Sequence, residues 1–328
     1  MSSRVVVFGS LNVDATCYVD AFARPGETIS ASGFRLALGG KGTNQAVAAH
    51  VAGAEVDLLA RIGDDANGAL ATETLERLGL STRHLERIPD APTGVALITV
   101  TASGENTVVV AGGANLDWTA ADVELRGDRL AGADIVLTQG ELPAEVVDRV
   151  AAAAAEAGIR FVLNLAPPVP VAASTLALAD PLVVNEHEAR QVGIGPHLDG
   201  TDADADDLVD GAELDVWREA TAAAVRSGLA RSLVVTLGAA GAVAATETET
   251  VAVTAPTVQA VDTTGAGDGF TGTLAAFLAE GRGLDDAVRI AVAAASLAVQ
   301  HPGTVDAYAS RERVLEASDA VTGRKGGA

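Results

Sequence analysis

Short apolar runs alternate with stretches of helical periodicity over most of the second half of this chain. The apolar runs predict strands at 135–137, 161–163, 182–184 and 233–235, and the periodic stretches predict helices at 144–157, 213–226, 266–280 and 285–300. Predicted strands at 4–8 and 56–60 and predicted helices at 46–51 and 68–78 extend this pattern towards the N-terminus. Continuous apolar strands separated by helices are typical of a parallel sheet covered on both faces. The sequence therefore predicts a doubly wound α/β fold with a mostly parallel sheet.

Two segments depart from this alternation. Residues 15–38 lack a helical period and contain Pro25-Gly26, which favours short strands and turns. Two short runs at 95–100 and 107–111, rich in apolar and β-branched side chains, are joined by the turn 103–106, which predicts an antiparallel hairpin. We expect a single α/β domain over residues 1–328, with residues 11–38 and 94–112 forming a small β-sheet lid. An apolar patch on that sheet would suit a dimer surface.

Composition narrows the class of protein. The chain has 328 residues, of which 48% are hydrophobic and only 3% aromatic, so Ala, Val and Leu must build its core. No apolar run approaches the roughly 20 residues that a membrane span needs. The N-terminus leads directly into a strand rather than a signal peptide. The single cysteine, Cys17, rules out an internal disulfide and fits a reducing compartment, so we expect a cytoplasmic protein.

Charge excludes several partners. The formal net charge of −22 disfavours nucleic acid and anionic membranes as partners.

The histidines have no paired spacing, which argues against a zinc site. The only lysines are Lys41 and Lys325, and Lys325 is expected in a polar tail, so Lys41 is the one lysine of the folded body. The acidic segment 195–210 is expected to be a solvated surface insertion.

The heptapeptide 262–268 carries the clearest chemical signal. Gly265, Ala266 and Gly267 stand at a loop-to-helix junction, where first-turn amides lack internal partners and the helix dipole favours an anion. Asp268 follows in the first helical turn. A carboxylate base beside a phosphate cradle suits phosphoryl transfer to a hydroxyl group. The alternative is a glycine-rich connector in which Asp268 only caps the helix.

Polar residues follow several predicted strands, at the edge where ligands of parallel sheets bind. They are Asn12, Asp14, Glu141, Asn164, Asn185 and Glu188. Asn and Asp side chains can together bind the vicinal hydroxyls of a sugar. For each of these residues considered alone, the alternative is that its side chain only stabilises a local turn.

The loop Gly39-Gly40-Lys41-Gly42 resembles a phosphate loop but lacks the spacing of a Walker A motif. Its glycines would let the backbone approach a ligand, with Lys41 and Asn44 as donors; a tight loop before a helix is the alternative. The first strand does not lead into a dinucleotide-binding fingerprint, which leaves a dehydrogenase without support.

Two further motifs have both a functional and a structural interpretation. Asn185 and Glu188 lie on one face of a helical turn and could hold a hydrated Mg²⁺, or could form a capping box. The segment Thr236–Gly241 lacks bulky side chains, so an adenine ring could lie over it, although a simple hairpin turn would look the same.

Taken together, these segments resemble the ribokinase-like (PfkB-type) carbohydrate kinases. The resemblance extends in order over about residues 4–306 and rests on segments 9–14, 25–28, 39–49, 63–65, 93–96, 104–106, 113–115, 185–188, 236–238 and 262–268. It implies an ATP-dependent kinase in which Asp268 takes the proton of a sugar's primary hydroxyl and Gly265, Ala266 and Gly267 form the anion hole.

The resemblance also implies the ligand sites. Sugar-binding positions fall on Asn12, Asp14, Gly40, Lys41, Asn44 and Glu141; Asn185 and Glu188 would arrange Mg²⁺ and phosphate; and Thr236, Gly238, Gly241 and Gly267 would contact ATP. A monovalent cation, usually K⁺ in this family, would be held at Asp262, Thr264 and the segment Val299, Pro302, Gly303 and Thr304. Pro302 replaces a basic residue that is common in the family, and Thr43 replaces a frequent alanine.

The leading hypothesis is conversion of D-ribose and ATP into D-ribose 5-phosphate, with a homodimer formed through the lid strands. A nucleoside kinase or another pentose or hexose kinase of the family is the alternative enzyme. The Gly39–Asn44 loop favours a free sugar, because a nucleoside base would need aromatic stacking. The non-enzyme alternative is a catalytically silent protein that binds sugar or nucleotide.

Overall fold

The computed structural model of the chain describes residues 3–195, 212–321 and 323–327. The predicted acidic insertion at 195–210 lies outside the described residues except for Gly195. Within the described ranges, no helix is long and apolar enough to cross a membrane.

A ten-stranded sheet forms the centre of the molecule, in the order β14-β13-β12-β11-β10-β9-β8-β1-β4-β5. The seven strands from β11 to β5 run parallel, whereas β12, β13 and β14 add an antiparallel edge. Their bounds are β1 Arg4–Phe8, β4 Glu55–Gly63, β5 Leu85–Ile88, β8 Ile135–Gln139, β9 Arg160–Asn164, β10 Leu182–Asn185, β11 Leu233–Thr236, β12 Gly241–Ala245, β13 Glu249–Thr254 and β14 Gly323–Gly327. The predicted mostly parallel sheet is confirmed.

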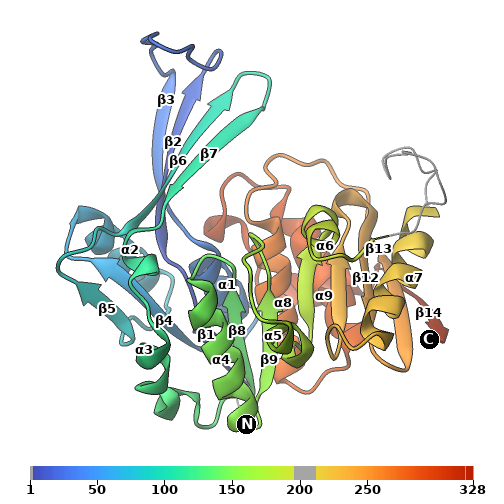
Figure 1. Cartoon of the computed structure of the whole chain (residues 1–328). Helices are drawn as coiled ribbons and strands as arrows, with labels where there is room; N and C mark the ends of the chain where they lie inside the picture. Colours follow the sequence, from blue (N-terminus) through green and yellow to red (C-terminus); the bar gives the residue numbers. More distant parts are fainter. Residues whose placement is uncertain (1–2, 196–211, 322, 328) are drawn as a thin grey trace.

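Helices cover both faces of this sheet. Side chains of β1 alternate between the two layers, because Val5 and Val7 face one core and Val6 and Phe8 face the other. The first core includes helices α1 Lys41–Val51, α2 Ala66–Arg77, α8 Ala266–Ala279, α9 Leu284–Ala298 and α10 Arg311–Ser318. The second includes α3 Ala120–Glu124, α4 Ala144–Glu156, α5 Ala173–Leu178, α6 Glu186–Gln191 and α7 Ala212–Arg226. The doubly wound architecture is thereby confirmed (Figure 1).

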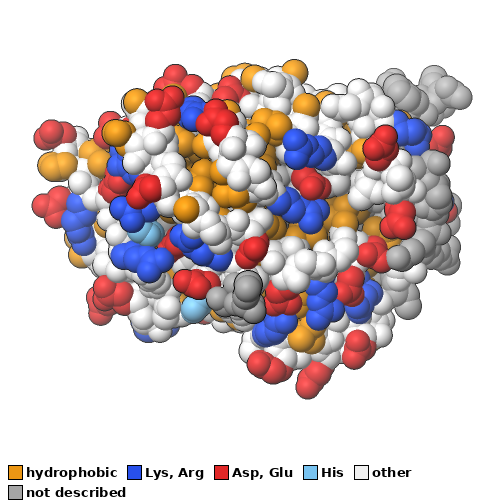
Figure 2. Space-filling model, turned by 90° about the horizontal axis from the view of Figure 1, so that it is seen from below, with side chains coloured by type: hydrophobic (Ala, Val, Ile, Leu, Met, Phe, Trp, Pro, Cys, Tyr) orange, Lys and Arg blue, Asp and Glu red, His pale blue; other side chains and the backbone are white. Residues whose placement is uncertain are grey.

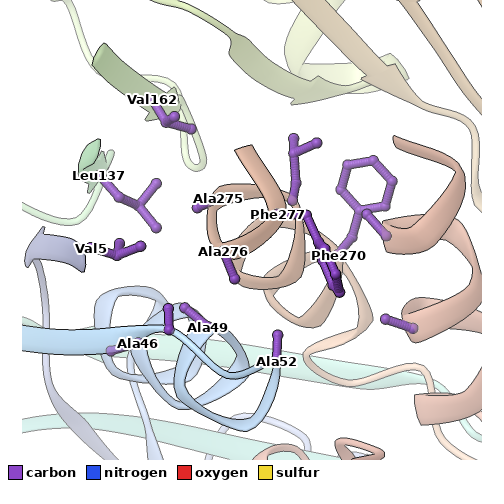
Figure 3. Close-up of a cluster of buried hydrophobic side chains, with 14 of the residues drawn as sticks. Val5, Ala46, Ala49, Ala52, Leu137, Val162, Phe270, Ala275, Ala276 and Phe277 are labelled. Carbon is purple, nitrogen blue, oxygen red and sulfur yellow. The ribbon is translucent and has the colours of Figure 1, made fainter. Parts of the chain in front are cut away.

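Small side chains bring α1 and α8 together beneath the site. Ala46 and Ala49 of α1 face Ala275 and Ala276 of α8 across the first core (Figure 3). A Cβ on Gly272 would lie 2.2 Å from the carbonyl oxygen of Gln45, so only glycine fits there. This close approach places the first turns of the two helices side by side.

A separate four-stranded sheet projects from the main body, in the order β3-β2-β6-β7 (Figure 1). Its strands are β2 Asn12–Val19, β3 Gly33–Gly39, β6 Gly94–Thr101 and β7 Asn106–Ala111. The predicted hairpin is confirmed, since β6 and β7 pair antiparallel. Strands β2 and β6 pair parallel along their whole length and join the two excursions into one sheet.

Two sequence predictions need correction, and several elements were not predicted. The helix expected at 46–51 begins at Lys41, so Lys41 and Asn44 lie in its first turn rather than in a loop. Residues 323–327, expected as a polar tail, form β14, and Lys325 pairs with Val251 of β13. The elements β5, β12, α5 and α10 lacked a clear pattern and were not predicted.

The opposite end of the molecule from the small sheet carries acidic and basic side chains intermixed (Figure 2). At this end the buried carboxylate of Asp57 on β4 accepts hydrogen bonds from Arg4 and Arg83. These bonds fasten the start of β1 to β4 and hold the pKa of Asp57 below its usual range against the opposing effect of burial.

Candidate active site

The candidate site lies at the carboxyl ends of β1, β8 and β9, between the small sheet and the first turns of α1 and α8. This is the edge at which open parallel sheets bind ligands. Three glycines shape it. A Cβ on Gly42 would lie 2.4 Å from the Cα of Gly9, and one on Gly39 would lie 2.2 Å from a carboxylate oxygen of Asp14. Gly40 has a φ of 89°, a left-handed conformation that favours glycine. The glycines of this loop therefore admit Asp14 and the end of β1.

Glu141 fixes the start of α1. Its Oε2 accepts hydrogen bonds from the Ser10 hydroxyl at 2.5 Å and from the backbone amide of Lys41 at 2.9 Å. The Lys41 side chain faces the carboxylates of Asp268, Glu141 and Glu188, which raise its pKa against the lowering effect of burial, with Asp268 contributing most. The ammonium is thus held charged among acids.

Asp14 is the most perturbed carboxyl group of the site. Burial raises its pKa to about 6, and the negative charges of Glu141 and Asp268 add to the effect. Burial makes the ionised form of this carboxyl costly. Hydrogen-bond donors such as sugar hydroxyls would stabilise that form. Asp14 therefore has the electrostatics of a ligand-binding acid.

Asn12 is held between the main body and the small sheet. The amide of Asn115 donates to Asn12 Oδ1 at 2.8 Å and to the Leu11 carbonyl at 3.0 Å, and its Oδ1 accepts from the Leu11 amide. A Cβ on Gly94 would lie 2.1 Å from Asn12 Oδ1. Asn115 thus orients Asn12, a role that the sequence did not indicate.

Asp268 lies in the first turn of α8 but does not cap it. The N-cap is Gly265, which has a left-handed φ of 73° and makes no side-chain cap. Both oxygens of Asp268 instead accept from α1: Oδ2 from the amide of Asn44 and Oδ1 from the amide of Gln45, each at 2.9 Å. The alternative interpretation of Asp268 as a capping acid is therefore wrong.

The turn before α8 is braced by the segment that follows α9. The hydroxyl of Tyr308 donates to the Gly265 carbonyl at 3.0 Å. A Cβ on Gly265 would meet the Thr304 methyl at 2.2 Å, and one on Gly269 would meet the Tyr308 ring at 2.9 Å. Glycines at these two positions let the segment press against the start of the helix. Tyr308 has a raised pKa because burial, and then the charge of Asp268, disfavours its phenolate.

A cavity of about 420 Å³ opens beside this helix start. Thr236, Gly238 and Gly241 line it, as do Ala266 and Gly267 at the start of α8. Apolar side chains including Val258, Phe270 and Val292 form much of the rest. The hairpin interpretation of 236–241 is confirmed, since β11 and β12 pair antiparallel around it, and residues of the same turn line the cavity.

Asn185 and Glu188 form a reciprocal capping box at the start of α6. Asn185 Oδ1 accepts from the Glu188 amide and Glu188 Oε2 accepts from the Asn185 amide, each at 2.8 Å. The structural interpretation of this pair is confirmed. Burial raises the pKa of Glu188, while the Asn185 amide and the charge of Lys41 oppose the rise, so this carboxyl also faces the site. In the part of the chain described, no three His, Cys, Asp or Glu side chains are grouped to hold a metal.

The predicted cation segments are joined to each other by Asp262. Its Oδ1 accepts from the Thr264 amide and its Oδ2 from the Gly303 amide, each at 2.9 Å. Thr304 is buried next to Gly265, while Pro302 is exposed. The Val299 carbonyl accepts from the amides of Val261 at 2.7 Å and Asp262 at 3.1 Å, which occupies its lone pairs. Val299 is thus the residue of this set least suited to bind a cation.

Several residues of the site have no counterpart in the sequence prediction. They are Ser10, Gln45, Asn115, Gln139 and Tyr308. Each acts by holding another residue. Ser10, Gln45 and Asn115 lie in segments that carry the family resemblance, but no local pattern indicated which residues they hold.

Known proteins resemble this chain over nearly its whole length. Residues 2–311 match the pfkB family of carbohydrate kinases. A ribokinase of Haemophilus influenzae is 33% identical over 319 residues, covering 96% of this chain and 98% of the relative. A deoxyribokinase of Salmonella typhi is 32% identical over 95% of this chain and 97% of the relative. The structure of Arabidopsis thaliana ribokinase complexed with ribose and ATP superposes with a TM-score of 0.83 at 30% identity, covering 97% and 99% of the two chains. The chain is a member of the pfkB family of carbohydrate kinases.

Proposed function

We propose that this protein transfers the terminal phosphoryl group of ATP to the primary hydroxyl of D-ribose, giving D-ribose 5-phosphate. The observation that carries the proposal is the position of Asp268, whose carboxylate lies in the first turn of α8 next to the Gly265–Gly267 amides and faces Lys41 and Asp14. The curated relatives named ribokinase and the ribokinase structure complexed with ribose and ATP support it.

The sugar would lie between the start of α1 and the small sheet. Asp14 and Glu141 would accept hydrogen bonds from its hydroxyls, and Asn12, Lys41 and the Gly40 amide would supply donors. Asn44 gives direct support, because its Oδ1 is buried without a hydrogen-bond partner while its amide is held by Asp268. A buried acceptor of this kind costs free energy until a ligand donor reaches it.

ATP would occupy the cavity beside α8, with its adenine over the turn of Thr236, Gly238 and Gly241 and its phosphates towards Gly267. The terminal phosphoryl would accept hydrogen bonds from the Gly265–Gly267 turn, where the helix dipole adds to the attraction. Asp268 would take the hydroxyl proton late in a loose transition state, so most of the acceleration would come from positioning.

Glu188 and Asn185 are the residues that would hold a hydrated Mg²⁺. The capping box supports this fit, because it leaves Glu188 Oε1 without a role in the cap. Mg²⁺ keeps several of its own waters and therefore needs few protein ligands. When bound, the ion would neutralise charge on the phosphates. For a monovalent cation, Asp262, Thr264, Gly303, Thr304 and Pro302 remain candidates, with K⁺ as the expected ion.

The small sheet would act both as a lid over the site and as the surface through which two copies form a dimer. One of its faces exposes Phe34, Leu36, Leu97 and Val109, with Phe34 63% and Val109 64% accessible. Exposed apolar side chains clustered on a sheet suit a second copy of the same sheet. Lid closure would exclude water and limit hydrolysis of ATP.

The dependence on ATP and the single Cys17 favour the cytoplasm as the compartment.

The second candidate substrate is 2-deoxy-D-ribose, favoured by the 32% identity to curated deoxyribokinases. Other pentoses, hexoses and nucleosides rank lower. A solved nucleoside kinase of the family is only 19% identical and shares the fold alone.

The test is ADP release with ATP and a panel of D-ribose, 2-deoxy-D-ribose, D-fructose and adenosine, in KCl and in NaCl at equal ionic strength. We expect the highest kcat/KM with D-ribose and faster turnover in KCl. A higher kcat/KM with another sugar or adenosine would replace the proposed substrate. Absence of ADP release with every compound would favour the silent binding protein.

A further inference from the structure

A buried chain of side-chain amides leads from the sheet to Asp268. Asn164, at the end of β9, donates through Nδ2 to the Val183 carbonyl of β10 at 3.0 Å. Its Oδ1 accepts from Gln45 Nε2 at 2.8 Å, and the same Nε2 donates to Asp268 Oδ1 at 2.9 Å. Gln139, at the end of β8, donates to Gln45 Oε1 at 2.8 Å. Side chains at the ends of β8 and β9 thus converge on Gln45, and Asn164 also bonds to β10.

The direction of every amide in this chain is determined. The Val183 carbonyl can only accept, so Asn164 must turn its nitrogen to the sheet and its oxygen to Gln45. An ionised Asp268 also only accepts, so the Gln45 nitrogen must lie between two acceptors. Gln45 Oε1 is left for the Gln139 nitrogen. A flipped amide at position 45 would set oxygen against oxygen at two of these contacts.

Gln45 has no polar atom left for a ligand. Its nitrogen uses both hydrogens on Asp268 and Asn164, its oxygen accepts from Gln139, and its side chain is completely buried. The neighbouring Asn44 differs, because its Oδ1 is unpaired. The two consecutive residues of α1 therefore have separate tasks: Asn44 can contact both Asp268 and a sugar, whereas Gln45 serves Asp268 alone.

The backbone makes this contact rigid. The missing side chain of Gly272 lets α8 approach the carbonyl of Gln45 itself, so both helices are fixed within one turn of the amide–carboxylate contact. A carboxylate held at one oxygen by a buried amide cannot rotate freely about its χ2 angle.

We propose that Gln45 is a positioning residue for phosphoryl transfer: anchored by Asn164 and Gln139, it fixes one oxygen of Asp268 so that the remaining lone pairs face the sugar hydroxyl. The inference rests on the proposed function. In that step the hydroxyl oxygen forms a bond to the γ-phosphorus, the bond from this phosphorus to the β–γ bridging oxygen breaks with its electron pair leaving on ADP, and the hydroxyl proton passes to Asp268. Correct orientation of the acceptor affects this step more than substrate binding.

The test compares Gln45→Glu and Gln45→Met. Gln45→Glu keeps the shape and the acceptor for Gln139 but sets a new carboxyl against Asp268, whereas Gln45→Met removes the hydrogen bonds at similar volume. Ala155→Glu, on the exposed side of α4, adds the same charge elsewhere and serves as control. Each variant is assayed for kcat and KM with D-ribose and ATP between pH 5 and pH 9, with melting temperature as a check on folding.

We expect Gln45→Glu to lower kcat by about tenfold or more and to move the acid limb of the kcat profile up by about one pH unit, since neighbouring carboxyls share a proton. Gln45→Met should lower kcat about tenfold without moving the limb, with both KM values within about threefold. The titratable groups facing Asp268 are Asp14, Lys41, Glu188 and Tyr308. All of them are retained in these variants, so a shift of the acid limb is attributable to the substitution at position 45.

An unmoved limb in Gln45→Glu, or a kcat within twofold of the unaltered protein in Gln45→Met, overturns the inference. If Gln45→Glu does not fold, the kcat of Gln45→Met decides. Failure of the proposed function is separate, because it appears as absent turnover in the unaltered protein or as turnover that survives Asp268→Asn.

Discussion

The side-chain amide of Asn44 donates a hydrogen bond of 2.9 Å to the carboxylate of Asp268, although 224 positions separate them in the sequence. Asn44 belongs to the helix that starts at the glycine loop, and Asp268 to the helix that starts at the phosphate-binding turn. The contact therefore joins the place proposed for the sugar to the place proposed for the terminal phosphate.

Asp14 should control the pH dependence of sugar capture. Its pKa of about 6 predicts that kcat/KM for D-ribose falls below that pH, because a protonated carboxyl can accept fewer hydroxyl hydrogen bonds. Asp14→Asn should remove this limb and lower kcat/KM at pH 8 by about a hundredfold. The control is Asp20→Asn, at an exposed position directly after β2, and its profile should overlay that of the unaltered protein.

Asp14 should also lower stability at neutral pH. Because its folded pKa is raised above the model-peptide value of 3.8, the native state binds its proton more tightly than the unfolded state between these two values. This contribution to stability is therefore present at low pH and is lost as the pH rises to about 6. Asp14→Asn should raise the free energy of unfolding at pH 8 by about 1 kcal/mol or more in urea titrations. An equal or lower free energy of unfolding for Asp14→Asn at pH 8 would contradict the raised pKa of Asp14.

Tyr308→Phe should loosen the phosphate-binding turn while leaving the sugar site intact. The change removes the hydrogen bond to the Gly265 carbonyl, which is worth about 1 kcal/mol in stability. We expect kcat to fall about tenfold with KM for D-ribose within twofold. Tyr18→Phe, which removes an exposed hydroxyl on the small sheet, should change neither constant. A raised KM for the sugar at unchanged kcat would place Tyr308 in a different role.

Gly272→Ala should separate α1 from α8. The new methyl would lie 2.2 Å from the Gln45 carbonyl and 2.7 Å from the Ala48 Cβ, so the helices must shift. Overpacking of this kind costs about 1–3 kcal/mol and should lower both melting temperature and kcat. Gly127→Ala is the matched control because a Cβ there meets nothing within 4 Å. Equal melting temperatures for the two variants would show that this helix contact is not tight.

The exposed face of the small sheet should mediate dimer formation. Placing a charge there with Phe34→Glu should convert a dimer into a monomer, because burying an unpaired carboxylate costs several kcal/mol. Light scattering during size-exclusion chromatography measures the mass. Leu125→Glu changes an even more exposed leucine on the main body, 79% accessible, and should leave the mass unchanged. A dimer that persists in Phe34→Glu would locate the interface elsewhere.

The fold was largely predictable because its signals are local. Runs such as Ile135–Leu137 and Leu233–Val235 appear as strands without reference to the rest of the chain, and both lie in the parallel part of the sheet. The start of α1 at Lys41 was missed because its N-cap, Gly40, offers no capping side chain. Strand β14 was missed because Gly323–Gly327 has no apolar pattern and is defined by its pairing with β13.

The candidate site was only partly predictable. Asp14, Lys41, Asn44, Glu141 and Asp268 were predicted from motifs, and they do converge. The residues that hold them were not predicted, because their partners are remote: Gln45 meets Asp268 across 223 positions. Tyr308 reaches Gly265 across 43. Such pairings depend on tertiary packing rather than on any pattern in the neighbouring sequence.

The most direct test of the central claim is the turnover of Asp268→Asn with D-ribose and ATP, measured beside the binding of D-ribose and of a non-hydrolysable ATP analogue. The variant keeps the shape of the side chain but removes the proton acceptor. We predict that kcat falls by about a thousandfold or more while both dissociation constants stay within about threefold. Turnover within tenfold of the unaltered protein would contradict the assignment of Asp268 as the base.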